Sequence, residues 1–190
     1  MGRILVACIT FVFPWTVRRW LLEWLFGYQI HPTSRIGLSW FFPKRLVMEA
    51  HSNVGHLNVC KGLDLVVLKQ YSIIARGNWI TGYPKNKTTH YYDQKDRLPQ
   101  LILEEHVGIS SRHIFDCTNS VTIGKYSTIG GFRSQFLSHS IDIKDCRQTS
   151  KPIRIGDYCF VGTDCVLLGG STLPDYSILG AKSLLNKQYQ

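Results

Sequence analysis

The stretch that decides the fold is residues 155–187, which read IGDYCFVGTDCVLLGGSTLPDYSILGAKSLLNK. An aliphatic residue occupies every sixth position: Ile155, Val161, Leu167, Leu173, Leu179 and Leu185. A small residue follows each of the first five, four positions later: Cys159, Cys165, Ser171, Ser177 and Ser183. A helix with 3.6 residues per turn would spread this period around its surface, whereas a short strand followed by a corner fits it. The repeat therefore predicts a parallel β-solenoid with aliphatic side chains pointing inward and glycine at the corners.

The same period occurs earlier in the chain, with changes of phase. One run is Ile30, Ile36, Phe42, Met48, Val54, Cys60 and Val66; shorter runs are Leu101 and Val107, then Ile123 and Ile129. A change of phase requires extra residues at a corner or a loop that leaves the stack. We expect an inserted loop at about residues 81–100, which are polar and contain two prolines, and a second loop at residues 142–152. Long loops on a rigid scaffold are where binding residues concentrate.

Composition narrows the class of protein. The chain has 190 residues, of which 44% are hydrophobic, so it is long and apolar enough for one folded domain with an appendage. The net charge of +9 favours an anionic partner. Nucleic acid is not expected, because the sequence has no run of Arg and Lys and no zinc-finger spacing. The six cysteines form no CxxC pair and are expected to be reduced thiols, with Cys159 and Cys165 inside the solenoid.

Residues 1–29 differ in kind from the repeating body, which we place at residues 30–190. They are rich in apolar and aromatic residues, but the uncharged run at residues 4–17 is shorter than the ~20 residues that a membrane-spanning helix needs. We expect a helix lying in the membrane interface, with Arg18 and Arg19 at the headgroups and Trp15, Trp20 and Trp24 at the boundary. The alternatives are a helix that caps the end of the solenoid and a cleaved signal peptide.

Residues 117–187 resemble the final coils of the hexapeptide-repeat acyltransferases, and the likeness extends loosely back to about residue 30. The pattern is similar to that of galactoside, maltose, polysaccharide and antibiotic O-acetyltransferases. The resemblance implies an all-β fold, the left-handed parallel β-helix. It also implies acetyl-CoA as cosubstrate, no metal, and a homotrimer with its active sites between neighbouring chains.

The resemblance also assigns catalytic roles. The family's catalytic histidine matches His139, which would accept the proton of an acceptor hydroxyl. The acidic position that orients this histidine or holds the acceptor matches Asp116, with Asp142 as a rival. The backbone N–H that stabilises the oxyanion matches Thr163. Phe160 stands where the family usually has Trp and is expected to line the acceptor slot.

Coenzyme contacts follow from the same comparison. The backbone that binds the pantetheine arm matches Gly180 and Ala181, with Gly162 one coil earlier and Ser183 close by. Lys187, and Lys182 near it, match positions that often meet the coenzyme A phosphates. The Pro-rich segment that commonly closes the family's chains does not follow Lys187 in this sequence.

The function implied is acetyl transfer from acetyl-CoA to a sugar hydroxyl, on a glycan or lipid-linked glycan of polysaccharide biosynthesis. We expect it at the cytoplasmic face of a membrane, where coenzyme A is present. The alternatives are an acceptor that is a small molecule, an antibiotic or a lipid, and a solenoid that binds without catalysing. A γ-class carbonic anhydrase shares the fold but needs three histidine ligands; His51 and His56 have a suitable spacing, whereas the only earlier histidine, His31, does not.

Overall fold

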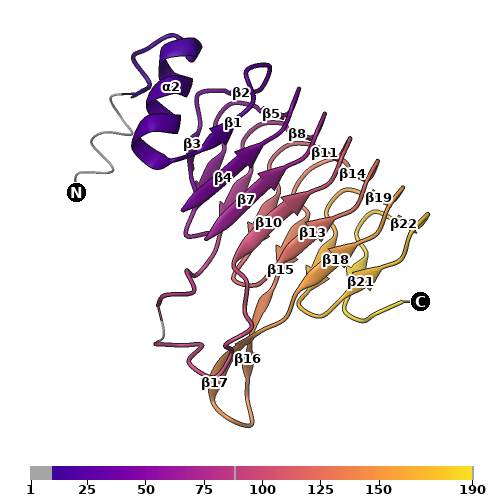
Figure 1. The fold of residues 1–190 in the computed structure, drawn as a ribbon. Coiled ribbons are helices and arrows are strands. Elements are labelled where there is room, and N and C mark those ends of the chain that lie inside the picture. Colours follow the sequence, from indigo (N-terminus) through magenta and orange to yellow (C-terminus); the bar gives the residue numbers. More distant parts are fainter. Residues whose placement is uncertain (1–9, 88, 190) are drawn as a thin grey trace.

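The computed structural model describes residues 10–87 and 89–189 and is a parallel β-helix (Figure 1). Three sheets of seven strands form its sides, here named A, B and C. The chain passes from A to B to C and back to A, so that each coil adds one strand to each sheet and every pairing within the three sheets is parallel. This is the left-handed parallel β-helix that the resemblance implies.

The strands are short, and their bounds are as follows. Sheet A contains β1 (Gln29–Ile30), β4 (Arg45–Met48), β7 (Leu65–Leu68), β10 (Gln100–Leu103), β13 (Val121–Ile123), β18 (Ile153–Ile155) and β21 (Thr172–Leu173). Sheet B contains β2 (Arg35–Ile36), β5 (Asn53–Val54), β8 (Ile73–Ile74), β11 (Gly108–Ile109), β14 (Thr128–Ile129), β19 (Phe160–Val161) and β22 (Ile178–Leu179). Sheet C contains β3 (Trp40–Phe42), β6 (Val59–Lys61), β9 (Trp79–Thr81), β12 (Ile114–Asp116), β15 (Gln135–Leu137), β20 (Val166–Leu168) and β23 (Leu184–Leu185). A separate antiparallel hairpin is formed by β16 (His139–Asp142) and β17 (Arg147–Ser150), and one helix, α2 (Trp15–Phe26), precedes the first coil.

The core is a stack of side chains from the three sheets. The register aligns one inward residue per coil, for example Ile123, Ile155 and Leu173 in sheet A, all of them buried. The aliphatic repeat of residues 155–185 therefore points inward as predicted, with Leu179 only partly buried. The prediction for Phe42 is wrong: Phe41 points into the core, because the corner between β2 and β3 is one residue shorter than the period requires, and Phe42 packs at the edge of the core.

The glycines that follow the aliphatic residues are needed for space rather than for a corner conformation. A Cβ on Gly124 would lie 2.5 Å from the carbonyl carbon of Gly156, and one on Gly162 would lie 2.7 Å from the Ala181 nitrogen. Neither residue is among the glycines with positive φ. The left-handed positions at the A–B and B–C corners are mostly side-chain-bearing residues, such as Tyr126 and Lys182. The predicted glycines do lie at the corners, directly after the strands, but the reason for them is the close approach between coils and not a left-handed backbone.

At the A–B corner the left-handed residues carry rings that stack on one another. The series is His51, Tyr71, His106, Tyr126, Tyr158 and Tyr176. Successive ring centroids lie 4.7 to 5.1 Å apart, which is the spacing of neighbouring strands. We call this series the ring ladder. Its stacking offsets the cost of holding a residue other than glycine at positive φ.

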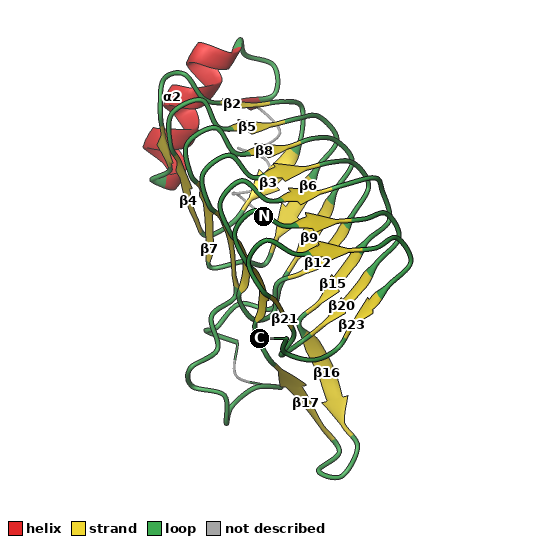
Figure 2. Ribbon diagram, turned by 90° about the vertical axis from the view of Figure 1, so that its right-hand side faces the viewer, coloured by secondary structure: helices red, strands yellow, loops and turns green. Residues whose placement is uncertain are grey.

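Both insertions leave the stack at the C–A corner and lie beside each other (Figures 1 and 2). The first, residues 82–99, separates β9 from β10, so that the observed loop is one residue shorter at each end than the predicted residues 81–100. The second contains the β16–β17 hairpin. Gln94 of the first accepts hydrogen bonds from the Ser150 backbone N–H and hydroxyl, and Asp93 pairs with Arg147 at 2.8 Å. The two insertions therefore form one structure.

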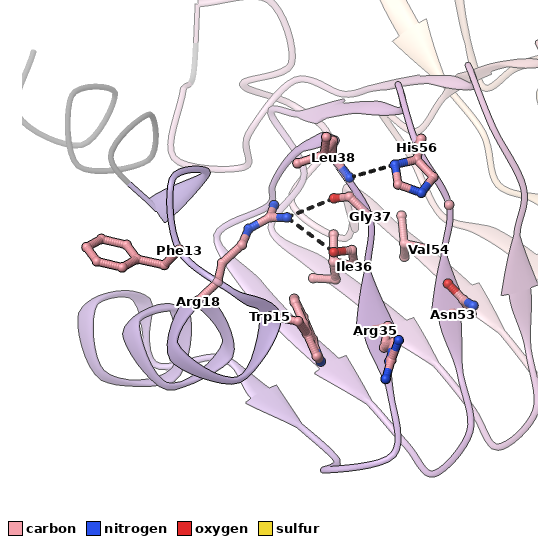
Figure 3. A pocket seen from close by; sticks show the side chains of 11 residues that line it. Phe13, Trp15, Arg18, Arg35, Ile36, Gly37, Leu38, Asn53, Val54 and His56 are labelled. Carbon is pink, nitrogen blue, oxygen red and sulfur yellow. Dashed lines mark hydrogen bonds between the residues drawn. The ribbon is translucent and has the colours of Figure 1, made fainter.

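The helix α2 covers the open end of the first coil, as in the capping alternative. Leu22 is buried in the core, and the buried guanidinium of Arg18 donates hydrogen bonds to the carbonyls of Ile36 and Gly37 (Figure 3). The Trp15 indole donates to the Ser34 carbonyl. The predicted position of Arg18 and Trp15 at a membrane surface is therefore wrong, because both side chains are used to attach the helix. The division between residues 1–29 and 30–190 stays a prediction.

The outward face of α2 still carries two aromatic residues. Trp20 and Trp24 stack with their centroids 5.8 Å apart and have exposed fractions of 58% and 70%. In the part of the chain that the structure describes, no helix combines the length and apolar character needed to cross a membrane. Residues 1–9, which contain part of the uncharged run at residues 4–17, lie outside the described residues.

Candidate active site

His139 and Asp116 meet at the C–A corner, where the hairpin leaves the stack. Asp116 ends β12, and His139 begins β16 one coil later. The Asp116 carboxylate accepts hydrogen bonds from His139 Nδ1 and from the His139 backbone N–H, the latter at 3.0 Å. Its other oxygen accepts from the Thr118 N–H at 3.0 Å and from the Thr118 hydroxyl at 2.6 Å. Four donors thus hold the carboxylate in place.

These contacts shift the pKa values of His139 and Asp116 in opposite directions. The hydrogen bond from its ring to Asp116 raises the pKa of His139, against an opposing effect of partial burial. Burial acts to raise the pKa of Asp116, but the hydrogen bonds from His139 and Thr118 outweigh it and leave that pKa below its ordinary value. With Nδ1–H donating to the carboxylate, Nε2 is the basic nitrogen, and it has no hydrogen-bond partner among residues 10–87 and 89–189. Half of the His139 side chain is exposed, so Nε2 is available to a substrate.

A residue of the first insertion, Arg97, holds the segment that follows Asp116. Arg97 is buried, and its guanidinium donates to the carbonyls of Thr118, at 2.9 Å, and of Tyr83 and Pro84. It lies over the Tyr91 ring, 4.6 Å from the centroid. Burial raises the pKa of Tyr91, and the charge of Asp116 adds to that effect.

Sequence reasoning missed Arg97, Gln94 and Thr118. A polar loop gives no local signal of which of its charged residues is buried. The one available signal was the position of the loops, since both insertions fall between a sheet C strand and a sheet A strand.

Asp142 does not contact His139. It lies at the far end of β16, opposite Arg147, and its carboxylate accepts the backbone N–H groups of Lys144 and Asp145 in the hairpin turn. The expectation that it orients the histidine is wrong, because the extended β16 strand carries the two side chains away from each other.

A second group of predicted residues lies at the B–C corner. Gly162 and Thr163 follow β19, and Gly180 to Ser183 follow β22 one coil later. The two stretches are in direct contact: the Lys182 N–H donates to the Thr163 carbonyl at 2.9 Å. The Thr163 hydroxyl bonds to the Phe132 backbone in the preceding coil, whereas its backbone N–H has no partner within the described ranges. That N–H is therefore free to bind a developing oxyanion.

Phe160 lies next to this corner, whereas Lys187 lies at another one. Phe160 lies on the outer face of sheet B, where its ring covers Gly130. Lys187 follows β23 at the C–A corner, and its backbone carbonyl accepts the Thr172 N–H. It thus lies at the corner of His139 and not at the corner of Ala181, because one sheet C strand intervenes between the two.

Sheet C lies between the two groups, and its outer face is largely apolar. One outward column runs through all seven strands: Trp40, Val59, Trp79, Ile114, Gln135, Val166 and Leu184. Trp79, Ile114 and Leu184 are exposed. Within one chain, the width of this sheet separates His139 from Thr163 and Ala181.

His113, which is close to this sheet, is structural. It is fully buried, and burial lowers its pKa to about 4, so that the ring is neutral. Its Nδ1 accepts the Ser134 N–H, and Nε2 bonds to the Ser110 hydroxyl. Among the described residues, no group of three or more His, Cys, Asp and Glu side chains is arranged to hold a metal ion.

Comparisons with known proteins give a consistent fold but no family assignment. The sequence matches no protein-family model and no curated protein. Among solved structures, the polysialic-acid-specific acetyltransferase NeuO is 16% identical, with 85% of this chain and 67% of that chain covered and a TM-score of 0.44. A Bacillus cereus protein described as a candidate acetyltransferase is 14% identical, with 84% and 73% covered and a TM-score of 0.42.

The acetyltransferase domain of PglB from Neisseria gonorrhoeae is 13% identical, with 84% and 62% covered and a TM-score of 0.36. The chain thus spans 62% to 73% of the lengths of these three proteins. At these identities and scores the likeness concerns the β-helix alone, and the function has to be argued from the site.

Proposed function

We propose that this protein is an acetyl-CoA-dependent O-acetyltransferase. The observation that carries the proposal is the His139–Asp116 pair, in which the carboxylate binds Nδ1 and leaves Nε2 as an exposed base. A general base must hold its proton-accepting atom toward the substrate and titrate near neutral pH, and a histidine oriented by a carboxylate satisfies both conditions.

In the proposed reaction His139 Nε2 accepts the proton of an acceptor hydroxyl as the hydroxyl oxygen attacks the thioester carbonyl carbon. The oxyanion that forms is stabilised by a backbone N–H, for which Thr163 is the candidate. The carbon–sulfur bond then breaks, and the imidazolium returns the proton to the departing thiolate. The products are an acetyl ester and free coenzyme A, and no cysteine has to act as a nucleophile.

We propose that His139 and Thr163 meet across an interface between chains. The two groups lie at opposite edges of sheet C, so that they cannot serve one reaction within a single chain. The apolar outer column of sheet C is a surface that a neighbouring copy would bury. A heterologous contact that closes under threefold symmetry would place His139 of one chain against the B–C corner of the next. Ala181 and Lys182 would then contact coenzyme A there.

We further propose a sugar hydroxyl as the acceptor, on a glycan presented at the cytoplasmic face of a membrane. Trp20 and Trp24 on the outer face of α2 are the residues expected to contact the membrane surface. Flotation with liposomes of anionic lipid tests this role: the protein should float with the vesicles, and a Trp20→Ser/Trp24→Ser variant should not. Equal flotation of the two proteins would contradict it.

The experiment for the proposed activity measures coenzyme A release from acetyl-CoA with a panel of oligosaccharides, and compares the protein with a His139→Ala variant. Transfer is expected only with His139 present. If the folded wild-type protein binds a glycan but releases no coenzyme A with any acceptor, a binding solenoid without catalysis is the better description. Light scattering of the active preparation tests the trimer, which an active monomer would contradict.

A further inference from the structure

A pocket of about 550 Å³ lies at the C–A corner of the first two coils, beside the start of the first insertion. Its volume is within the range of small-molecule sites. Four aromatic residues form one side: Phe26 from the end of α2, Tyr28, Trp40 and Phe42. Their rings pack against one another, with centroid distances of 4.9 Å for Trp40–Phe42 and 5.4 Å for Phe26–Phe42. The aromatic wall is therefore held in shape by its own contacts.

The rest of the pocket includes four charged residues. Lys44, Lys61 and Lys87 line it, against a single acidic side chain, Asp64. The three lysines are exposed, and Lys61 and Lys87 also lie near the rings of Trp79 and Tyr83. The pocket is thus electropositive and suits an anionic group.

Asp64 adds a second requirement. Its Oδ2 accepts the Lys85 N–H at 3.0 Å, whereas its Oδ1 is buried and has no hydrogen-bond partner in the described part of the chain. A carboxylate with an unpaired oxygen favours a ligand that brings an O–H or N–H to it. Inorganic phosphate has no apolar face for the aromatic wall, a neutral sugar leaves the lysines unmatched, and an alkyl phosphate has no sugar hydroxyl for Asp64.

We propose that this pocket binds a glycosyl phosphate. The sugar ring packs on the aromatic wall formed by Trp40 and Phe42, one hydroxyl donates to the Asp64 carboxylate, and the phosphate lies among Lys44, Lys61 and Lys87. The pocket is at the same corner as His139 and three coils away, which is about 14 Å at the ordinary strand spacing. This inference rests on the proposed function. The pocket would hold the phosphate-bearing end of an acceptor with more than one sugar unit, while His139 acts on a hydroxyl farther along that acceptor.

Isothermal titration of the full chain with glucose 1-phosphate tests the proposal, with glucose, inorganic phosphate and dodecyl phosphate as comparison ligands. Glucose 1-phosphate should bind once per chain and at least tenfold more tightly than each of the other three. Lys44→Gln/Lys61→Gln should weaken this binding at least tenfold and Asp64→Asn several-fold. Lys125→Gln, an exposed lysine after β13 paired with Glu105, should leave it unchanged.

The substituted lysines are exposed, so these variants are expected to fold. The proposal is overturned if glucose or inorganic phosphate binds as tightly as glucose 1-phosphate, if the double lysine variant binds normally, or if dodecyl phosphate binds best. His139→Ala should bind glucose 1-phosphate like the wild type. Binding without acetyl transfer would therefore contradict the proposed activity alone, and transfer without binding would contradict this pocket alone.

Discussion

The A–B and C–A corners of the β-helix are built from the same repeat but have different content. At the A–B corner every coil turns in a similar way, and the ring ladder runs along it without an insertion. At the C–A corner two insertions leave the stack, and His139, Asp116 and the aromatic pocket lie there.

The difference shows how a repeat protein separates stability from chemistry. A regular corner gains from stacking identical elements, because each ring meets the next at the strand spacing. An interrupted corner loses that stacking but can place side chains that no repeat would bring together. Residues 82–99 and the β16–β17 hairpin bring such side chains together at the C–A corner. Substitutions at the C–A corner should therefore change mainly the activity, and substitutions in the ring ladder should change mainly the unfolding free energy.

The largest effect is expected for His139→Ala. Removing the general base should lower kcat by about 10²–10⁴-fold. The unfolding free energy should change little, since the ring is half exposed. Steady-state kinetics together with thermal unfolding measures both quantities. Asp142→Asn is the matched control in the same hairpin and should retain full activity. A folded His139→Ala protein with normal turnover would rule out the assignment.

The next effect concerns the insertions. Arg97→Met removes the donor for three backbone carbonyls, and a hydrogen bond from a charged donor contributes about 1.5–3 kcal/mol. The first insertion should become sensitive to limited proteolysis, and acetyl transfer should fall because Thr118 and Asp116 lose their support. Lys95→Met, in the same loop, is the control. Unchanged proteolysis of the Arg97 variant would show that the loop is held by other contacts.

Asp116→Asn should lower kcat by roughly ten- to hundredfold, a part of the contribution of a positioned base. It should also change the pH dependence. A base must be neutral to act, so activity rises with pH through the pKa of His139. Since Asp116 raises that pKa, the rising limb should move to lower pH in the variant. The measurement is the pH profile of kcat/KM, and a limb that stays in place would show that a different group titrates.

The smallest effect is expected in the ring ladder. Tyr126 stacks on two neighbours and Tyr176 on one. With about 0.5–1.5 kcal/mol for each aromatic pair, Tyr126→Ala should lower the unfolding free energy about twice as much as Tyr176→Ala. Chemical denaturation measures this, and kcat should be unchanged in both variants. Loss of activity without loss of stability would show that the A–B corner contributes to the site.

Several features of the fold could be predicted from the sequence, because the signal of a solenoid is local. One residue in six points into the core, and this can be recognised without knowing which residues the next coil places beside it. The changes of phase indicate where the insertions lie. Phe41 was missed because two adjacent aromatic residues fit the period almost equally well, and only the packing of β3 against β6 decides between them. The glycines after the inward aliphatic residues were identified from the sequence. The reason for them, the close approach of the next coil, is visible only in the structure.

The sequence by itself determined the repeat, the inward residues of residues 155–185 and the two insertions. By resemblance it also pointed to His139. The tertiary structure alone decided that Asp116 rather than Asp142 binds the ring, that Arg97 is buried, and that α2 is attached through Arg18. The physical reason is the variable coil length: Ile155 pairs with Leu173, 18 positions on, but Leu68 pairs with Leu103, 35 positions on. A local period cannot show which residues such unequal coils bring to the same corner.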